Sequence, residues 1–108
     1  MAEYRYCQVI TTTDSRESAE ALASGAVQAR LAASAQVIGP IASTYWWKGK
    51  IESTQEWQVI FKAELGRYPP LEEHIRANHT YEVPEIYCTP MVAGHQAYLE
   101  WISTETAR

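Results

Sequence analysis

Near the middle of the chain stands Tyr45-Trp46-Trp47-Lys48-Gly49-Lys50-Ile51, a turn between two segments rich in aromatic and β-branched residues. Its centre, Lys48-Gly49-Lys50, predicts a tight hairpin turn because glycine adopts positive φ without steric cost. The return segment, from about residue 51 to residue 65, alternates in polarity as a strand does. One face would carry Trp57, Val59, Phe61, Ala63 and Leu65, and the other Glu56, Gln58, Ile60, Lys62 and Glu64.

The two arms of this hairpin are unusually long. The first arm begins near Gln36 and includes Gly39-Pro40, which predicts a bulge or bend because proline cannot donate a ladder hydrogen bond. Each arm exceeds ten residues, whereas typical strands have about five or six. The end of such a hairpin would expose Tyr45, Trp46, Trp47 and Ile51, so we expect another subunit to cover it.

The remaining segments supply two more strands and three helices. We expect strands at 5–13 and 85–89 and helices at 14–31, 69–78 and 94–102. Asp14 and Glu17 form a pattern close to a capping box for the first helix, and Gly25 within it suggests close packing on a sheet. Pro69-Pro70 is a fitting helix start. In the last helix we expect Tyr98, Trp101 and Ile102 to be the buried anchors.

This order, β-α-β-β-α-β with a terminal helix, predicts an α+β fold of the ferredoxin-like (split βαβ) kind: an antiparallel sheet with helices on one face. The 108 residues suffice for one domain, 1–108, and not for two.

Composition narrows the classes of function. Nine Lys and Arg against thirteen Asp and Glu give a net charge of −4, and the basic residues are scattered, which argues against a nucleic-acid partner or an anionic membrane. No apolar run approaches the length of a membrane span, and the N-terminus does not read as a secretory signal. Cys7 and Cys88 lack CxxC spacing, so we expect reduced thiols and a cytoplasmic location.

Several short motifs, in order and at matching spacing, resemble the CutA divalent-cation tolerance family. They are Arg30-Leu31-Ala32-Ala33, Tyr45-x-Trp47-x-Gly49-Lys50-Ile51, Glu56 with Lys62, His79-x-Tyr81-Glu82-Val83-Pro84-Glu85-Ile86, and Gly94-x3-Tyr98-Leu99-x-Trp101.

The resemblance implies a homotrimer similar in architecture to the PII signal proteins, with the long hairpin packed across a neighbour. It also implies a role in tolerance of copper or another divalent cation. Copper-binding members can carry Cys where Thr11 stands and His where Asn78 stands, so only His79 of that set is present. Ser34 and Thr80 also depart from the family pattern, at positions where Cys and Pro are common.

The densest group of potential metal ligands is His79, Glu82 and Glu85, which could hold one cation with a further ligand from a neighbouring subunit. The alternative is that His79 caps the preceding helix or hydrogen-bonds a carbonyl group while the two carboxylates are solvated.

A second candidate is an intersubunit cleft that binds a small anionic effector through Lys62, lined by Tyr45, Trp47, Tyr81 and Trp101. Lys62 and Glu56 lie six residues apart on one strand, about 20 Å, so they cannot pair with each other. The alternative for Lys62 is an ordinary interfacial ion pair.

Motifs for catalysis are missing from the sequence. It contains no G-x-S-x-G, P-loop, G-x-G-x-x-G or H-E-x-x-H pattern. His79 with Glu85 could act as a general base, but no nucleophile or oxyanion hole accompanies them. We therefore expect a non-enzymatic protein.

Overall fold

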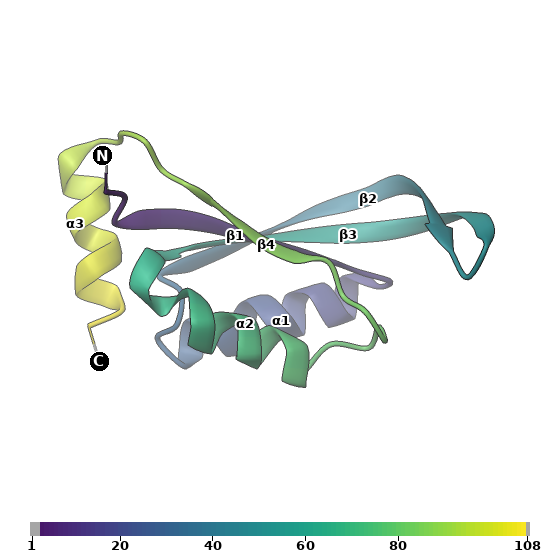
Figure 1. Ribbon diagram of the computed structural model, residues 1–108. Coiled ribbons are helices and arrows are strands. Elements are labelled where there is room, and N and C mark those ends of the chain that lie inside the picture. Colours follow the sequence, from purple (N-terminus) through teal and green to yellow (C-terminus); the bar gives the residue numbers. More distant parts are fainter. Residues whose placement is uncertain (1–2, 108) are drawn as a thin grey trace.

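The computed structural model describes residues 3–107, which form one four-stranded sheet and three α-helices (Figure 1). In chain order the elements are β1 (Tyr6–Thr13), α1 (Arg16–Gln28), β2 (Ser34–Trp47), β3 (Lys50–Glu64), a 3₁₀ turn (Leu65–Arg67), α2 (Tyr68–Ala77), β4 (Ile86–Pro90) and α3 (Gln96–Glu105).

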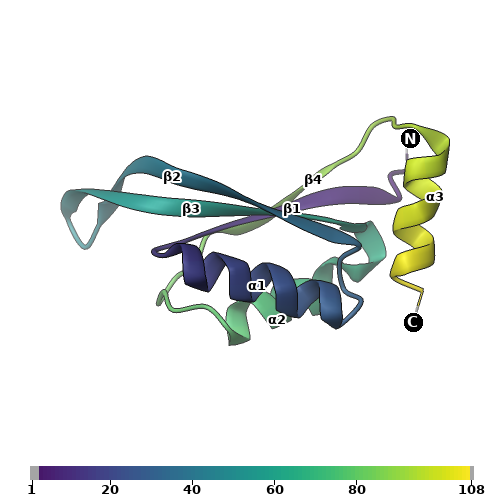
Figure 2. The ribbon, with the colours of Figure 1, turned by 180° about the vertical axis from the view of Figure 1, so that it is seen from behind.

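The sheet has the strand order β2-β3-β1-β4, and every neighbouring pair is antiparallel. This is the order of the split βαβ arrangement, so the predicted α+β topology is confirmed. Figures 1 and 2 show α1 and α2 side by side on one face of the sheet, with α3 at the end opposite the hairpin turn.

The core lies between the sheet and the helices α1 and α2. Val59, Phe61 and Ala63 of β3 are fully buried there, which confirms the predicted apolar face of that strand. They form one cluster with residues of β1 and both helices, among them Val9, Leu22, Leu71 and Ile75. Burial of a large aliphatic or aromatic side chain contributes about 1.5–3 kcal/mol, so this cluster holds the sheet to its helices.

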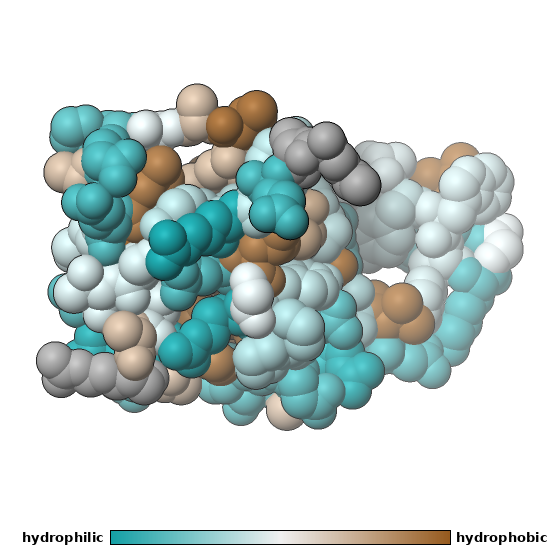
Figure 3. Space-filling model, turned by 60° about the vertical axis from the view of Figure 1, so that its left-hand side comes forward, coloured by the Kyte–Doolittle hydropathy of each residue, from teal (hydrophilic) through white to brown (hydrophobic). Residues whose placement is uncertain are grey.

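The hairpin of β2 and β3 extends well beyond the helices. Its turn has positive φ at Lys48 (50°) and Gly49 (81°), as the glycine predicts. The pairing shifts register between Ile38 and Ile41, which confirms the irregularity expected at Gly39-Pro40. Figure 3 shows the hairpin projecting from the body of the molecule. In this single chain Trp46 is 72% exposed and Ile51 61% exposed.

Three local predictions are wrong. The N-cap of α1 is Ser15, whose side chain accepts from the Ser18 amide at 3.0 Å, because Asp14 lies one residue too early. Gly25 faces α2 rather than the sheet: a Cβ there would lie 3.1 Å from Nε2 of His74. In α3 only Ile102 of the three expected anchors is buried.

The other two expected anchors of α3, Tyr98 and Trp101, are 37% and 40% exposed, and their rings stack on each other with centroids 6.0 Å apart. Polar contacts hold the helix instead: the Tyr6 hydroxyl lies 2.7 Å from Oγ of Ser103, and Arg30 pairs with Glu105 at 2.9 Å.

Within residues 3–107, both cysteines are free thiols, Cys7 buried and Cys88 half-buried, as expected. Among the described helices, none is both long enough and apolar enough to cross a membrane.

Candidate functional site

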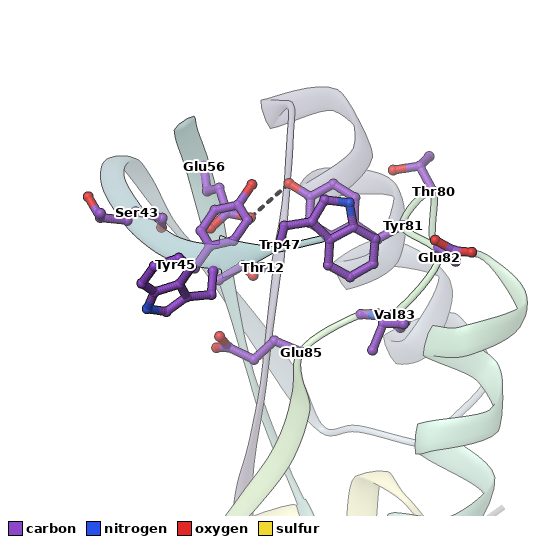
Figure 4. Close-up of a pocket in the computed structure, with 13 residues that line it drawn as sticks. Thr12, Ser43, Tyr45, Trp47, Glu56, Thr80, Tyr81, Glu82, Val83 and Glu85 are labelled. Carbon is purple, nitrogen blue, oxygen red and sulfur yellow. Dashed lines mark hydrogen bonds between the residues drawn. The ribbon is translucent and has the colours of Figure 1, made fainter. Parts of the chain in front are cut away.

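A cavity of about 840 Å³ opens where the hairpin meets the loop between α2 and β4, residues 78–85 (Figure 4). The hairpin contributes Tyr45, Trp46, Trp47 and Glu56, and the end of β1 contributes Thr12. The loop contributes residues 80–85. We call this cavity the hairpin pocket.

His79 fastens the loop to the sheet. Its Nε2 lies 2.8 Å from the carbonyl oxygen of Thr12, and its Nδ1 accepts from the amide of Tyr81 at 3.1 Å. Because Nδ1 is the acceptor, Nε2 carries the proton and donates to Thr12. Both ring nitrogens are therefore occupied, which is the arrangement expected of a structural histidine.

Tyr81 and Glu56 form the inner polar contact of the hairpin pocket. The Tyr81 hydroxyl donates to Oε2 of Glu56 at 2.7 Å, and the Glu56 residue is only 6% exposed. Burial, together with the hydrogen bond to Glu56 and its charge, raises the pKa of Tyr81. The phenol therefore remains a hydrogen-bond donor at neutral pH.

The rim of the hairpin pocket carries an ammonium group. Nζ of Lys48 lies 3.7 Å from Oε2 of Glu82 and 5.5 Å from the centre of the Trp47 ring. The Lys48 and Glu82 side chains are about 70% exposed (71% and 69%). A pair this exposed adds little to stability.

The charged side chains that line the hairpin pocket are all acidic. Three of its lining residues are carboxylates, Glu56, Glu82 and Glu85, and none of the described lining residues is basic. Figure 4 shows the Glu85 side chain extending from the loop toward the side of the pocket that carries Tyr45. In residues 3–107, however, no three His, Cys, Asp or Glu side chains converge as metal ligands do. The pocket therefore favours positive charge without a ready-made metal centre.

The structure brings together five of the eight residues predicted for a site. Tyr45, Trp47 and Tyr81 of the predicted cleft share the hairpin pocket with Glu82 and Glu85 of the predicted metal set. The third member of the metal set, His79, sits behind the loop in the two hydrogen bonds described above.

Lys62 and Trp101 lie elsewhere in this single chain. Nζ of Lys62 donates to Oε1 of Gln36 at 2.7 Å, and Trp101 lies on α3, at the opposite end of the sheet (Figure 1). As expected, Lys62 and Glu56 do not pair with each other. The cleft between subunits, with its anionic effector, stays a prediction, and the carboxylates of the hairpin pocket do not favour an anion there.

Thr12 and Glu56 are among the pocket residues that the predicted site did not include. Alternation placed Glu56 on the polar face of β3 and gave no sign of its burial. Its partner Tyr81 lies 25 residues later in a loop, a contact that periodicity cannot reveal. The signal for Thr12 was its position at the end of a strand, next to the first helix.

Topology and pocket together define the class, an antiparallel α+β protein with an acidic cavity under a projecting hairpin. The sequence matches the CutA1 divalent ion tolerance protein family over residues 7–105, and the chain belongs to that family.

Relatives and solved structures agree with this assignment. Protein CutA, chloroplastic, of Arabidopsis thaliana is 40% identical over 91% of this chain, and the divalent-cation tolerance protein CutA of Thermus thermophilus is 35% identical over 91% of it. The crystal structure of CutA from Xylella fastidiosa has a TM-score of 0.92 at 34% identity and covers 94% of this chain and 98% of its own.

This chain spans about half the length of the plant relatives, 54% for Arabidopsis and 55% for rice, but 95% of the Thermus protein. The cytoplasmic location expected from the sequence needs correction. The two plant relatives are named chloroplastic, and a structural neighbour from Archaeoglobus fulgidus, 31% identical with a TM-score of 0.91, is described as periplasmic. These names do not support the cytoplasmic location that the N-terminal residues and the free cysteines had suggested.

Proposed function

We propose that this chain acts as a non-enzymatic homotrimer in the cellular response to divalent cations, copper among them. One observation carries the proposal: membership of a divalent ion tolerance family, found in a chain whose hairpin pocket has only carboxylates as charged lining groups. Oxygen ligands suit hard divalent cations, and imidazole suits copper. None of the relatives named above carries the name of an enzyme.

For direct contact with a cation we propose Glu82 and Glu85, which are exposed, and His79 as the third ligand of the predicted set. His79 can coordinate a metal only after it gives up one of its two hydrogen bonds. A ligand from a neighbouring subunit would complete the site, because the described residues of one chain do not supply three converging groups.

The trimer is proposed to form through the hairpin and the edges of the sheet, in a PII-like arrangement. Support comes from the apolar side chains that one chain leaves exposed at the hairpin end, Trp46 and Ile51 above all. Light scattering should give a particle of three times the 12.2 kDa chain mass. A particle of one chain mass would overturn this part of the proposal.

Copper binding is tested by titrating tag-free protein against a competing chelator. We expect the double variant Glu82→Gln/Glu85→Gln and the variant His79→Ala each to lose at least tenfold in copper affinity. Glu20→Gln, an exposed α1 residue, is the charge control and should bind as the unaltered protein does. Equal affinities in all four proteins would discard the predicted ligands.

The cellular role has its own test. In a strain whose own homologue is deleted, this chain should restore growth on otherwise inhibitory copper. Growth that is the same with and without the chain would overturn the proposed function.

A further inference from the structure

Cys7 and Cys88 lie on the same face of two paired strands. In the antiparallel pairing of β1 with β4, Cys7 stands opposite Pro90 and Val9 stands opposite Cys88. Cys7 and Val9 are two residues apart and so share a face, and residues directly opposite each other share one as well. The two thiols are therefore diagonal neighbours on the face that α1 and α2 cover, where Val9 is fully buried (Figure 1).

The pair belongs to the body of the single chain and not to the hairpin end. Cys7 is fully buried in the core cluster, and the half-buried Cys88 packs against that cluster. Tyr68, at the start of α2, packs there too. Burial and the hydrogen bond to Glu72 raise the pKa of Tyr68 to about 12, and both thiols add to this shift. One chain thus supplies all the side chains around the two sulfurs.

The two sulfur atoms also influence each other. Burial raises the pKa of Cys7, and the neighbouring Cys88 adds to the shift through its charge and a hydrogen bond. Cys7 is therefore a neutral thiol at neutral pH. A metal ion can still displace its proton, because a thiol that coordinates a metal is deprotonated outright.

The spacing of a diagonal pair suits a metal ion better than a disulfide. A disulfide brings its sulfurs to about 2.05 Å and its Cβ atoms to about 3.5–4.5 Å. Diagonal neighbours in a sheet have Cβ atoms up to about 7–8 Å apart, which is too wide without a movement of the backbone. A metal ion in line between two thiolates, with bonds of roughly 2.3 Å, holds the sulfurs roughly 4.6 Å apart.

The number and kind of ligands select the metal. Within residues 3–107 no three His, Cys, Asp or Glu side chains converge, so no carboxylate or imidazole group of the same chain joins the two thiols. Zinc takes four ligands in structural sites, and calcium and magnesium prefer oxygen. Thiolates select soft cations such as copper(I), which accepts two ligands in line, as silver(I) does.

We propose that Cys7 and Cys88 together bind one soft monovalent cation, copper(I) in its biological form, as a two-coordinate centre between β1 and β4. Two S–H bonds break, two metal–sulfur bonds form, and both protons leave to solvent. The metal keeps its oxidation state, so the step consumes no oxidant or reductant. This site does not depend on His79, Glu82 and Glu85, because it uses other ligands and another class of cation.

The test is titration of the full chain with silver(I), in chloride-free buffer, followed by native mass spectrometry. One ion should bind per chain. In weakly buffered solution at pH 7, each bound ion should release two protons, whereas a single thiol can release only one. Anaerobic titration with copper(I) against bicinchoninate should give the same stoichiometry. X-ray absorption should show two sulfur neighbours around the bound copper.

Variants identify the ligands. Cys7→Ala and Cys88→Ala should each weaken silver(I) binding by about a hundredfold or more, since the second thiol acts at a high effective concentration. Met91→Leu removes another sulfur close in sequence to Cys88 and should change nothing. His79→Ala should keep its full affinity for silver(I), and Cys88→Ala should keep its affinity for copper(II). The two metal-binding proposals therefore stand or fall separately.

Four results would overturn this proposal. They are the absence of saturable binding, equal affinity in the cysteine variants and the unaltered protein, release of fewer than two protons per ion, and one ion for every two chains, as a bridge between two copies of Cys88 would give. Thermal melts show which variants are folded. If Cys7→Ala does not fold, Cys88→Ala decides the question, because its side chain is only half-buried.

Discussion

The hydroxyl of Tyr81 lies 2.7 Å from Oε2 of Glu56, a contact that joins the 78–85 loop to the far arm of the hairpin. The two residues are 25 positions apart in the sequence, and the Glu56 residue is only 6% exposed. Removing the hydroxyl would leave that carboxylate without its only donor among the described residues.

Tyr81→Phe is therefore expected to lower the free energy of unfolding by about 1–3 kcal/mol, the cost of an unsatisfied buried polar group. Urea denaturation measures it. Tyr87→Phe is the matched control, because the Tyr87 residue is 46% exposed, and it should stay within about 0.5 kcal/mol of the unaltered protein. Equal effects of the two substitutions would contradict the role given to Tyr81.

His79→Ala removes two hydrogen bonds that fasten the same loop. We expect a loss of about 1–3 kcal/mol in the free energy of unfolding. Hydrogen exchange should also quicken at the Tyr81 amide, whose acceptor is Nδ1 of His79. The exposed residue His95 supplies the control variant His95→Ala. An unchanged exchange rate at Tyr81 would show that His79 does not hold the loop.

Gly25 and His74 predict a coupled pair of substitutions. In an open helix, Gly→Ala stabilises by up to about 1 kcal/mol. Here the new Cβ would lie 3.1 Å from Nε2 of His74, so the ring must move and that gain should vanish or reverse. In a His74→Ala background, Gly25→Ala should regain its stabilising effect. Thermal or urea unfolding of the four proteins gives the coupling, and additive effects would contradict the contact.

Burial raises the pKa of Cys7 from an ordinary 9.0 to about 12, with the neighbouring Cys88 adding to the shift. At pH 8 the folded thiol should therefore alkylate about a thousandfold more slowly than the same thiol in urea. A Cys88→Ala variant lets mass spectrometry follow Cys7 alone, with the contribution of Cys88 to the shift removed. Labelling at the same rate in folded and unfolded protein would contradict the burial.

The same shift sets a pH dependence with a definite sign. Below about pH 9 the Cys7 thiol is protonated in both folded and unfolded chains, so its contribution to stability is complete. Between about pH 9 and pH 12 the unfolded chain releases the proton first, and the free energy of unfolding falls as the pH rises. Urea midpoints over this range should fall less in Cys7→Ala.

The sequence predicted the fold well because the fold rests on local periodicity. Alternation along β3 identified the buried face of Val59, Phe61 and Ala63, and Lys48-Gly49-Lys50 located the turn. Helix ends were less predictable, because Asp14 and Ser15 are both good caps and one residue separates them.

The site was predicted only in part, since it depends on contacts distant in sequence. Tyr45, Trp47, Tyr81, Glu82 and Glu85 were singled out from their residue types, and they share one cavity. The sequence pattern could not show that both ring nitrogens of His79 form hydrogen bonds with backbone groups. It also could not show that Glu56 is buried. Residue type also gave a wrong prediction of burial. Tyr98 and Trp101 are large aromatic residues of the kind that anchor a helix, yet they lie at the surface of the single chain.

The register shift in β2 settles which face of the hairpin receives its aromatic side chains. Val37 stands opposite Val59 before the shift, and Ile41 stands opposite Glu56 after it, so β2 holds one residue more than its partner over this interval. Every side chain beyond that point thus changes face relative to an unbroken strand. Deleting one residue there would remove the bulge and leave both pairings, Val37 with Val59 and Tyr45 with Glu52, in register. A β2 strand that is one residue shorter at this point can accordingly keep the pocket, because the bulge takes up the difference in length.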